Sequence, residues 1–307
     1  MDLDALMRCL GTGSCVVTQL TSGLIIGMLL FLIASGVTLI FGVLNITNFA
    51  HGSLYMIGAY IALTLYRATG NYFVAAIGAA IAVGLLGVAF ERLLMSKVYG
   101  SNVLMQLLVC YAVILISDDL VKIIWGPSGL SMGMPAEFRL PPLRFMGGVV
   151  PPFYLFMIAA AMAIGLVLWL VIERTRFGKV VRAAAVNGPM VSALGIRVNL
   201  YYAAVFGIGS ALAGAAGALA GAAGALAAPV RSLTPGMGFS ILIESFIVTV
   251  IGGMGSIVGA FVAALLIGFT RSFGSIGFPL FVDGVMFLFM ALVLIFKPSG
   301  LFGRPHR

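Results

Sequence analysis

The chain consists mostly of long apolar stretches separated by short polar ones. Charged residues, Pro and Gly mark the boundaries, and the stretches predict helices near 23–44, 54–66, 72–90, 103–125, 151–172, 200–228, 238–252, 256–270 and 280–297. A helix needs about 20 apolar residues to cross the hydrocarbon core of a bilayer. The stretches 238–252 and 256–270 are short and are joined by GGMGS, so they predict either two thin spans or one broken re-entrant unit. The pattern therefore predicts eight or nine membrane-spanning helices.

The composition supports an integral membrane protein. Of 307 residues, 62% are hydrophobic and 8% are charged, and the mean hydropathy is +1.19, whereas about a quarter of the residues in a soluble domain are charged. Barrel strands would alternate in polarity, so the continuous apolar runs favour helices. We expect an all-α polytopic bundle with broken or re-entrant segments, forming one domain over residues 1–307.

The N-terminal twenty residues carry charges and lack the order of a cleaved signal peptide, so we expect the first helix to be retained. The three cysteines, Cys9, Cys15 and Cys110, are too few and too scattered for a disulfide framework or a metal site. We therefore predict three free thiols.

Basic residues are concentrated in residues 173–199 and indicate the orientation. The positive-inside rule places this loop in the cytoplasm. Counting spans from it places Arg92, Lys97 and the basic C-terminus on the same side, and the Pro/Gly-rich loop 126–152 on the periplasmic side. Cytoplasmic anchoring explains the net charge of +8, so the charge does not indicate nucleic-acid binding.

The stretch NITNFAHG, residues 45–52, is polar although apolar segments flank it. It contains no Pro, so the break is attributed to Gly52 and to side chains that compete for backbone hydrogen bonds. If the stretch is helical, Asn45, Asn48 and His51 share one face. Two interpretations are open: the side chains line a solute pathway, or they hydrogen-bond released backbone and hold neighbouring helices together.

The loop at 173–199 contains a compact helix signal. Asn187 can cap a helix, Pro189 suits its first turn and Gly195 can end it. The basic run before it could instead lie on anionic lipid headgroups. No stretch matches G-x-x-x-x-G-K-[ST], so the chain is not predicted to hydrolyse ATP itself.

Small residues recur every seven positions in the following helix. They form two stripes, Gly207, Gly214 and Gly221 in one, and Ser210, Gly217 and Gly224 in the other. Small residues allow helix backbones to approach closely in lipid. We therefore predict helix packing along this face.

A few carboxylates lie within apolar stretches, and such groups are candidate functional residues. Asp118 and Lys122 are predicted to neutralise each other at i, i+4. Glu244 is ambiguous, because it could line a pathway, contact another subunit or pair with Arg231 or Arg271.

Four motifs resemble the inner-membrane permeases of branched-chain amino acid ABC importers. The first is GVTLIFGVLNITNFAHGSLYMIGAYIA, in which Phe-Ala-His-Gly follows the first span, as in that family. The others are RTRFGKVVRAAAVNGPMVSALGIRVNLYYAAVFGIGSALAGAAGAL, IVTVIGGMGSIVGAFVAALLIG and KPSGLFGRP, in the expected order. The chain is identified as a member of this family, and its length favours the H-type branch over the longer M-type.

The resemblance implies a multi-pass translocation subunit of the bacterial inner membrane, without catalysis, metal or cofactor of its own. Its implied partners are a second permease chain, two ATPase subunits that bind ATP and magnesium, and a periplasmic substrate-binding protein. The implied solute is a branched-chain amino acid or a related small polar compound or organic acid. The implied coupling helix spans residues 187–196, with candidate contacts at Asn187, Pro189, Met190, Ser192 and Gly195.

An ion-coupled secondary transporter is the main alternative, with Glu244, His51 or Asp283 as a proton relay. The shortage of charge along the spans argues against it, and it leaves the capped cytoplasmic helix unexplained. An intramembrane hydrolase lacks HExxH and GxSxG motifs. In this family solute selectivity resides largely in the binding protein, so the solute does not follow from these residues.

Overall fold

The computed structural model describes the chain except residues 1–2, 140, 146, 224–232, 280 and 304–307. The described residues form eleven α helices: α1 (Leu3–Leu10), α2 (Gly13–Leu44), α3 (His51–Thr69), α4 (Tyr72–Leu93), α5 (Val103–Trp125), α6 (Pro152–Arg174), α7 (Arg176–Ala193), α8 (Val198–Ala223), α9 (Met237–Gly252), α10 (Ile257–Gly277) and α11 (Val282–Phe296). Two short 3-10 helices, η1 (Met95–Lys97) and η2 (Ala136–Phe138), and one antiparallel hairpin, β1 (Leu143–Phe145) with β2 (Gly148–Val150), complete the fold.

The all-α membrane architecture predicted from the sequence is confirmed. Each predicted apolar stretch contains one helix, and α2, α4, α6, α8 and α10 are each long and apolar enough to cross a bilayer. Of the predicted span 200–228, residues 224–228 lie outside the described part of the chain. The small hairpin in the loop 126–152 was not predicted.

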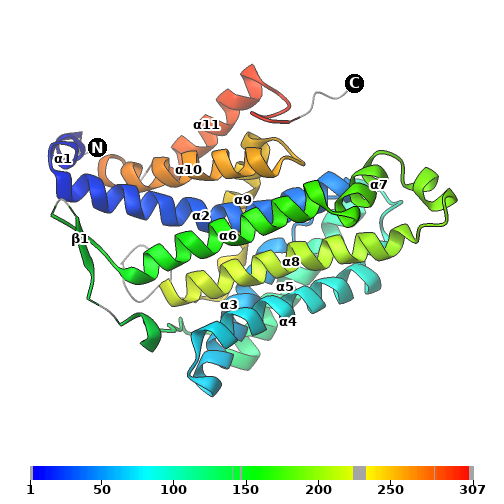
Figure 1. Cartoon of the computed structure of the whole chain (residues 1–307), viewed down its shortest axis with the longest axis horizontal. Helices are drawn as coiled ribbons and strands as arrows, with labels where there is room; N and C mark the ends of the chain where they lie inside the picture. Colours follow the sequence, from blue (N-terminus) through cyan, green and yellow to red (C-terminus); the bar gives the residue numbers. More distant parts are fainter. Residues whose placement is uncertain (1–2, 140, 146, 224–232, 280, 304–307) are drawn as a thin grey trace.

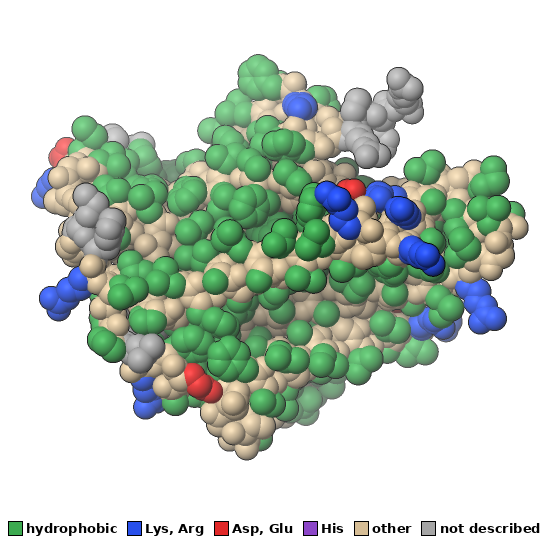
Figure 2. Space-filling model, in the orientation of Figure 1, with side chains coloured by type: hydrophobic (Ala, Val, Ile, Leu, Met, Phe, Trp, Pro, Cys, Tyr) green, Lys and Arg blue, Asp and Glu red, His purple; other side chains and the backbone are tan. Residues whose placement is uncertain are grey.

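The long helices run side by side along the longest axis of the molecule, with α1 and β1 at one end and α7 at the other (Figure 1). Helices α2 and α8 are mostly buried, whereas α4 and α6 expose much of their surface. The exposed residues of α4 and α5 include many large apolar side chains, and Figure 2 shows the apolar surface on the face that carries α4 and α6. Such a surface suits contact with lipid, because exposed apolar area on this scale is unfavourable in water.

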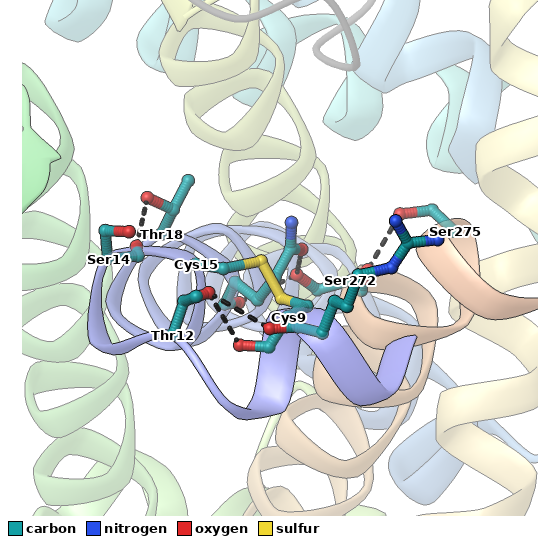
Figure 3. Close-up of a disulfide and its surroundings, with 9 residues drawn as sticks. Cys9, Thr12, Ser14, Cys15, Thr18, Ser272 and Ser275 are labelled. Atoms are coloured by element: carbon teal, nitrogen blue, oxygen red, sulfur yellow. Dashed lines mark hydrogen bonds between the residues drawn. A yellow bond between two sulfur atoms is a disulfide. The ribbon is translucent and has the colours of Figure 1, made fainter. Parts of the chain in front are cut away.

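A disulfide between Cys9 and Cys15 joins α1 to the start of α2 (Figure 3). The prediction of three free thiols was therefore wrong for this pair. The chain turns at Gly11 and Thr12, so the two Cα atoms lie 5.2 Å apart, within the range that a disulfide spans. Cys110 is a buried free thiol, as predicted.

The GGMGS stretch forms a tight turn between two separate helices, α9 and α10. Gly253 and Gly255 adopt positive φ angles of 98° and 87°, which only glycine adopts easily. The C-terminal segment 299–303 packs on this turn, where the N–H groups of Leu301 and Phe302 donate to the carbonyls of Ile251 and Gly252 at 2.8 and 3.0 Å. The segment therefore satisfies carbonyls that the end of α9 leaves unpaired.

The same turn also touches the end of α2. A Cβ added at Gly42 would lie 2.8 Å from the Cα of Gly255. The end of α2 packs with the end of α6 and with α7 in one apolar cluster. Parts of all four motifs that carry the family resemblance thus meet at the α7 end of the molecule.

Candidate functional site

The polar break between α2 and α3 is a real interruption of helical structure. Helix α2 ends at Leu44, and Asn45 adopts a left-handed conformation with φ 53°, which Asn tolerates better than most residues. Residues 45–50 are not helical, and α3 begins at His51. Asn45 is exposed, whereas Asn48 and His51 are buried. The alternative in which all three share one helical face is therefore wrong.

Asn48 stabilises the released backbone of the break. Its Oδ1 accepts a hydrogen bond from the N–H of Ala50 at 3.0 Å and lies 3.8 Å from the thiol of Cys110 on α5. Its Nδ2 is buried and donates no hydrogen bond to any described residue. Asn48 thus hydrogen-bonds the released backbone, as one of the two interpretations predicts. Its Nδ2 donor is not used by the described residues.

His51 is completely buried at the point where α2, α3 and α8 meet. A Cβ added at Gly36 of α2 would lie 2.8 Å from His51 Nε2 and 2.7 Å from the carbonyl oxygen of Gly209 on α8. The imidazole therefore occupies a notch that only glycine leaves open. Neither ring nitrogen makes a well-aligned hydrogen bond with the described residues, although the backbone of Ile33 lies close to the imidazole. A buried polar group without such a bond costs about 1 to 3 kcal/mol and calls for a functional explanation.

Helix α9 covers the next residue of the break. A Cβ at Gly52 would lie 2.0 Å from the carbonyl oxygen of Gly238, so α3 and α9 cross in direct backbone contact. The first turn of α3 is therefore held against three helices, α2, α8 and α9. Any movement at this point requires a shift of whole helices, because packed backbones cannot adapt by changing rotamers.

Glu244 of α9 forms an ion pair with Arg271 of α10. Both side chains are largely buried, with 10% and 25% of their surfaces exposed. Arg231, the other partner considered from the sequence, lies outside the described residues. The pair joins the two helices that flank the GGMGS turn.

Lys122 of α5 pairs with Asp119 at 3.0 Å. The predicted pair with Asp118 was therefore wrong. Asp119 and Lys122 both lie on the exposed side of the helix, whereas Asp118 is half-buried on the side that faces the bundle.

The capped segment predicted at 187–196 is present. Asn187 breaks the helical geometry of α7 with φ −152° and ψ 86°, and its Oδ1 accepts a hydrogen bond from the N–H of Met190 at 3.0 Å. Pro189 follows in the first turn of this second half, and Gly195 ends the turn with φ 80°. Ser192 is exposed. We call residues 187–195 the end segment.

Three large apolar side chains are exposed on or beside the end segment. Val186, Met190 and Leu194 are 87%, 63% and 74% exposed. Val186 and Leu194 are not among the residues predicted from the sequence, although their spacing of four residues from Met190 was a usable signal in a segment predicted to lie outside the lipid. Large exposed apolar side chains of this kind are suited to contact with another protein.

The small residues of α8 lie at crossings with two different helices. A Cβ at Gly207 or Gly214 would come within 3.0 Å of α4, and one at Gly217 would lie 2.2 Å from a carbonyl oxygen of α3. Gly221 has more room, with its nearest neighbour at 3.5 Å. Gly224 lies outside the described residues. The glycines therefore serve two crossings, and Gly214 takes part in both, because a Cβ at Gly58 of α3 would lie 2.5 Å from the Cα of Gly214.

Residues 19–296 match the family model described as branched-chain amino acid transport system, permease component. The chain is 33% identical over 300 residues to the high-affinity branched-chain amino acid transport system permease protein BraD of Pseudomonas aeruginosa, covering 94% of this chain and 96% of the relative. It is 30% identical over 303 residues to the corresponding LivH of Escherichia coli, with the same coverage. It is 27% identical over 301 residues to a probable LivH of Methanocaldococcus jannaschii, covering 92% and 91%. No solved structure matches the chain.

Proposed function

The chain belongs to the family of permease components of branched-chain amino acid transport systems, and from this premise we propose that it is the translocation subunit of an ATP-driven importer. The carrying observation is the end segment, which is capped and exposes large apolar side chains. We place this segment outside the lipid. The sequence has no nucleotide-binding motif of its own. The importer explains this combination, because a separate ATPase would cover the apolar side chains. We do not retain the ion-coupled alternative.

We propose that residues 1–307 form a single multi-pass domain of the bacterial inner membrane, with nine spans, α2 to α6 and α8 to α11. Two features at opposite ends support the orientation. The disulfide near α1 suits an oxidising compartment, the periplasm. Basic residues gather around α7 (Figure 2), which suits the cytoplasm. The loop 173–199 and the C-terminus are then cytoplasmic, and the loop 126–152 is periplasmic.

The proposed partners are a second permease chain, two ATPase subunits that carry ATP and magnesium, and a periplasmic binding protein. The ATPase contacts are Asn187, Pro189, Met190, Ser192 and Gly195, to which the exposure of Val186 and Leu194 adds two apolar contacts. The proposed solute is a branched-chain amino acid or a related small polar compound or organic acid.

Within the membrane, we assign different roles to the residues of the break. Asn45 ends α2. Asn48 and His51 keep polar atoms that make no well-aligned hydrogen bond with the described residues, and we propose that these atoms meet the solute when α3 moves away from α2 and α8. Glu244 holds α9 to α10 through Arg271.

The proposed contact between the end segment and the ATPase is tested with two variants, each of which adds one negative charge at one end of the molecule. Met190→Glu puts a carboxylate on the end segment, and Met7→Glu puts one on α1, where Met7 is 67% exposed. The two permease chains and the two ATPase subunits are co-expressed and purified in mild detergent. The ATPase that remains bound is quantified by mass spectrometry. We expect Met190→Glu to lose the ATPase and Met7→Glu to keep it. Solute transport by this chain alone in proteoliposomes would refute the proposal.

A further inference from the structure

A buried carboxylate lies near the end of α4, at the same end of the molecule as α7. Glu91 is 2% exposed, and its Oε1 accepts a hydrogen bond from the Tyr99 hydroxyl at 2.6 Å. Tyr99 belongs to the loop 94–102 between α4 and α5. Burial and the adjacent carboxylate of Glu91 raise the pKa of Tyr99, so the phenol remains a donor at any physiological pH.

Tyr99 connects this carboxylate to α8. Its ring meets the ring of Tyr202 edge-on, with 6.2 Å between centroids and an interplanar angle of 87°, a favourable geometry for an aromatic pair. Tyr202 lies at the start of α8. Glu91, Tyr99 and Tyr202 therefore form a continuous series of contacts from α4 to α8.

Tyr202 in turn touches the end segment. A Cβ added at Gly188 would lie 2.7 Å from the Tyr202 hydroxyl oxygen. The Tyr202 ring also packs on the apolar cluster of Ala184, Val191 and Val198. The position of the end segment thus depends on where the Tyr202 ring lies.

The loop that carries Tyr99 is itself anchored to the following helix. The Nε2 of Gln106, in the first turn of α5, donates to the carbonyls of Val98 and Ser101 at 3.3 and 3.4 Å. Met95, at the start of the loop, is completely buried. The loop is therefore fixed to both α4 and α5, and Tyr99 moves with this helix pair.

We propose that Glu91 and Tyr99 are positioning residues that tie the end segment to the helix pair α4–α5 through Tyr202. A displacement of the docked end segment is then passed to α4 and α5 and so to the membrane bundle. This inference rests on the proposed function of the end segment. A charge-assisted hydrogen bond is directional and strong, whereas an apolar pair would stabilise the bundle equally well without fixing an orientation.

The test uses the complete transporter in proteoliposomes and measures solute transported per ATP hydrolysed. Tyr99→Phe removes the hydrogen bond and keeps the ring, and we expect this ratio to fall about threefold or more while ATP hydrolysis continues. Glu91→Gln keeps an acceptor oxygen for Tyr99 but removes the charge, so the ratio should fall less than in Tyr99→Phe. Gly100→Ala is the matched control in the same loop, because no atom lies within 4 Å of the added Cβ, and it should change nothing.

Two results would overturn the inference: an unchanged ratio in Tyr99→Phe, which includes the case in which ATP hydrolysis and transport fall equally, or the same loss in Gly100→Ala. If Tyr99→Phe does not assemble, the test uses Tyr202→Leu with the same criteria. This variant removes the ring contact and leaves the hydrogen bond between Tyr99 and Glu91 intact. A wild-type chain that binds no ATPase would instead refute the proposed function, and this result is visible before any variant is compared.

Discussion

The crossing of α3 and α8 permits a quantitative test at Gly217. A Cβ placed there would lie 2.2 Å from the carbonyl oxygen of Tyr55 and 2.9 Å from the backbone nitrogen of Ala59. Both neighbours are backbone atoms, so no rotamer change relieves the overlap. Carbon and carbonyl oxygen normally approach to about 3.3 Å, so Gly217→Ala requires the helices to separate by about 1 Å.

The expected cost combines two opposing effects. Overpacking of this kind costs about 1 to 3 kcal/mol, and the higher helix propensity of Ala returns up to about 1 kcal/mol. We therefore expect Gly217→Ala to lower the free energy of unfolding by about 1 to 2 kcal/mol. Gly221→Ala is the matched control, because its Cβ would meet no atom closer than 3.5 Å, and it should be neutral or slightly stabilising.

The assay uses the buried thiol of Cys110, which is the free cysteine of the chain. The detergent-purified variants are heated with a thiol-reactive fluorophore, so that labelling reports the loss of packing. We expect Gly217→Ala to melt about 5 °C below Gly221→Ala. If the two variants melt within about 1 °C of each other, α3 and α8 do not make this contact and the reasoning is wrong.

Three further predictions concern other contacts. Replacing Cys9 and Cys15 together by Ser should cost no more than about 2 kcal/mol, because the closed loop is short; denatured wild-type protein should expose one thiol to maleimide without reductant and three with it, and three in both conditions would contradict the disulfide. Arg271→Leu should destabilise by about 3 kcal/mol, because it removes the cation beside a buried carboxylate; adding Glu244→Leu should restore most of the melting temperature, and no recovery would show that the ion pair is not what joins the helices. His51→Leu loses no well-aligned hydrogen bond and should keep stability within about 1 kcal/mol while abolishing transport; normal transport would remove His51 from the pathway.

The sequence predicts most of the helices because their signals are local. Apolar runs, glycines and charges define α4, α5, α6 and α9 closely, whereas α10 begins as predicted but continues to Gly277, seven residues beyond the predicted end at 270. The start of α2 was predicted at residue 23 but lies at Gly13, because residues 13–22 are too polar to read as a span. Contacts elsewhere in the fold satisfy these side chains, since Ser272 donates to the Gln19 side chain at 2.6 Å. A single sequence does not reveal such a distant partner.

In the candidate site, too, the features set by adjacent residues could be predicted, and the features set by distant residues could not. The cap at Asn187 and the terminator at Gly195 depend on adjacent residues and were predictable. The burial of His51 depends on glycines of α2 and α8 that lie far from it in the sequence. The disulfide depends on the turn between α1 and α2, whose geometry the spacing of the cysteines does not reveal.

The contact between residues 299–303 and the end of α9 has a consequence for the order of biosynthesis. The carbonyls of Ile251 and Gly252 receive their hydrogen bonds from Leu301 and Phe302, which the ribosome adds only after α10 and α11 have been made. Helices α2 to α6 can pack on one another as they leave the insertion machinery. The α9–α10 turn reaches its final form only after all the membrane helices have been synthesised, so translation that stops before residue 301 yields an inserted but unfinished bundle.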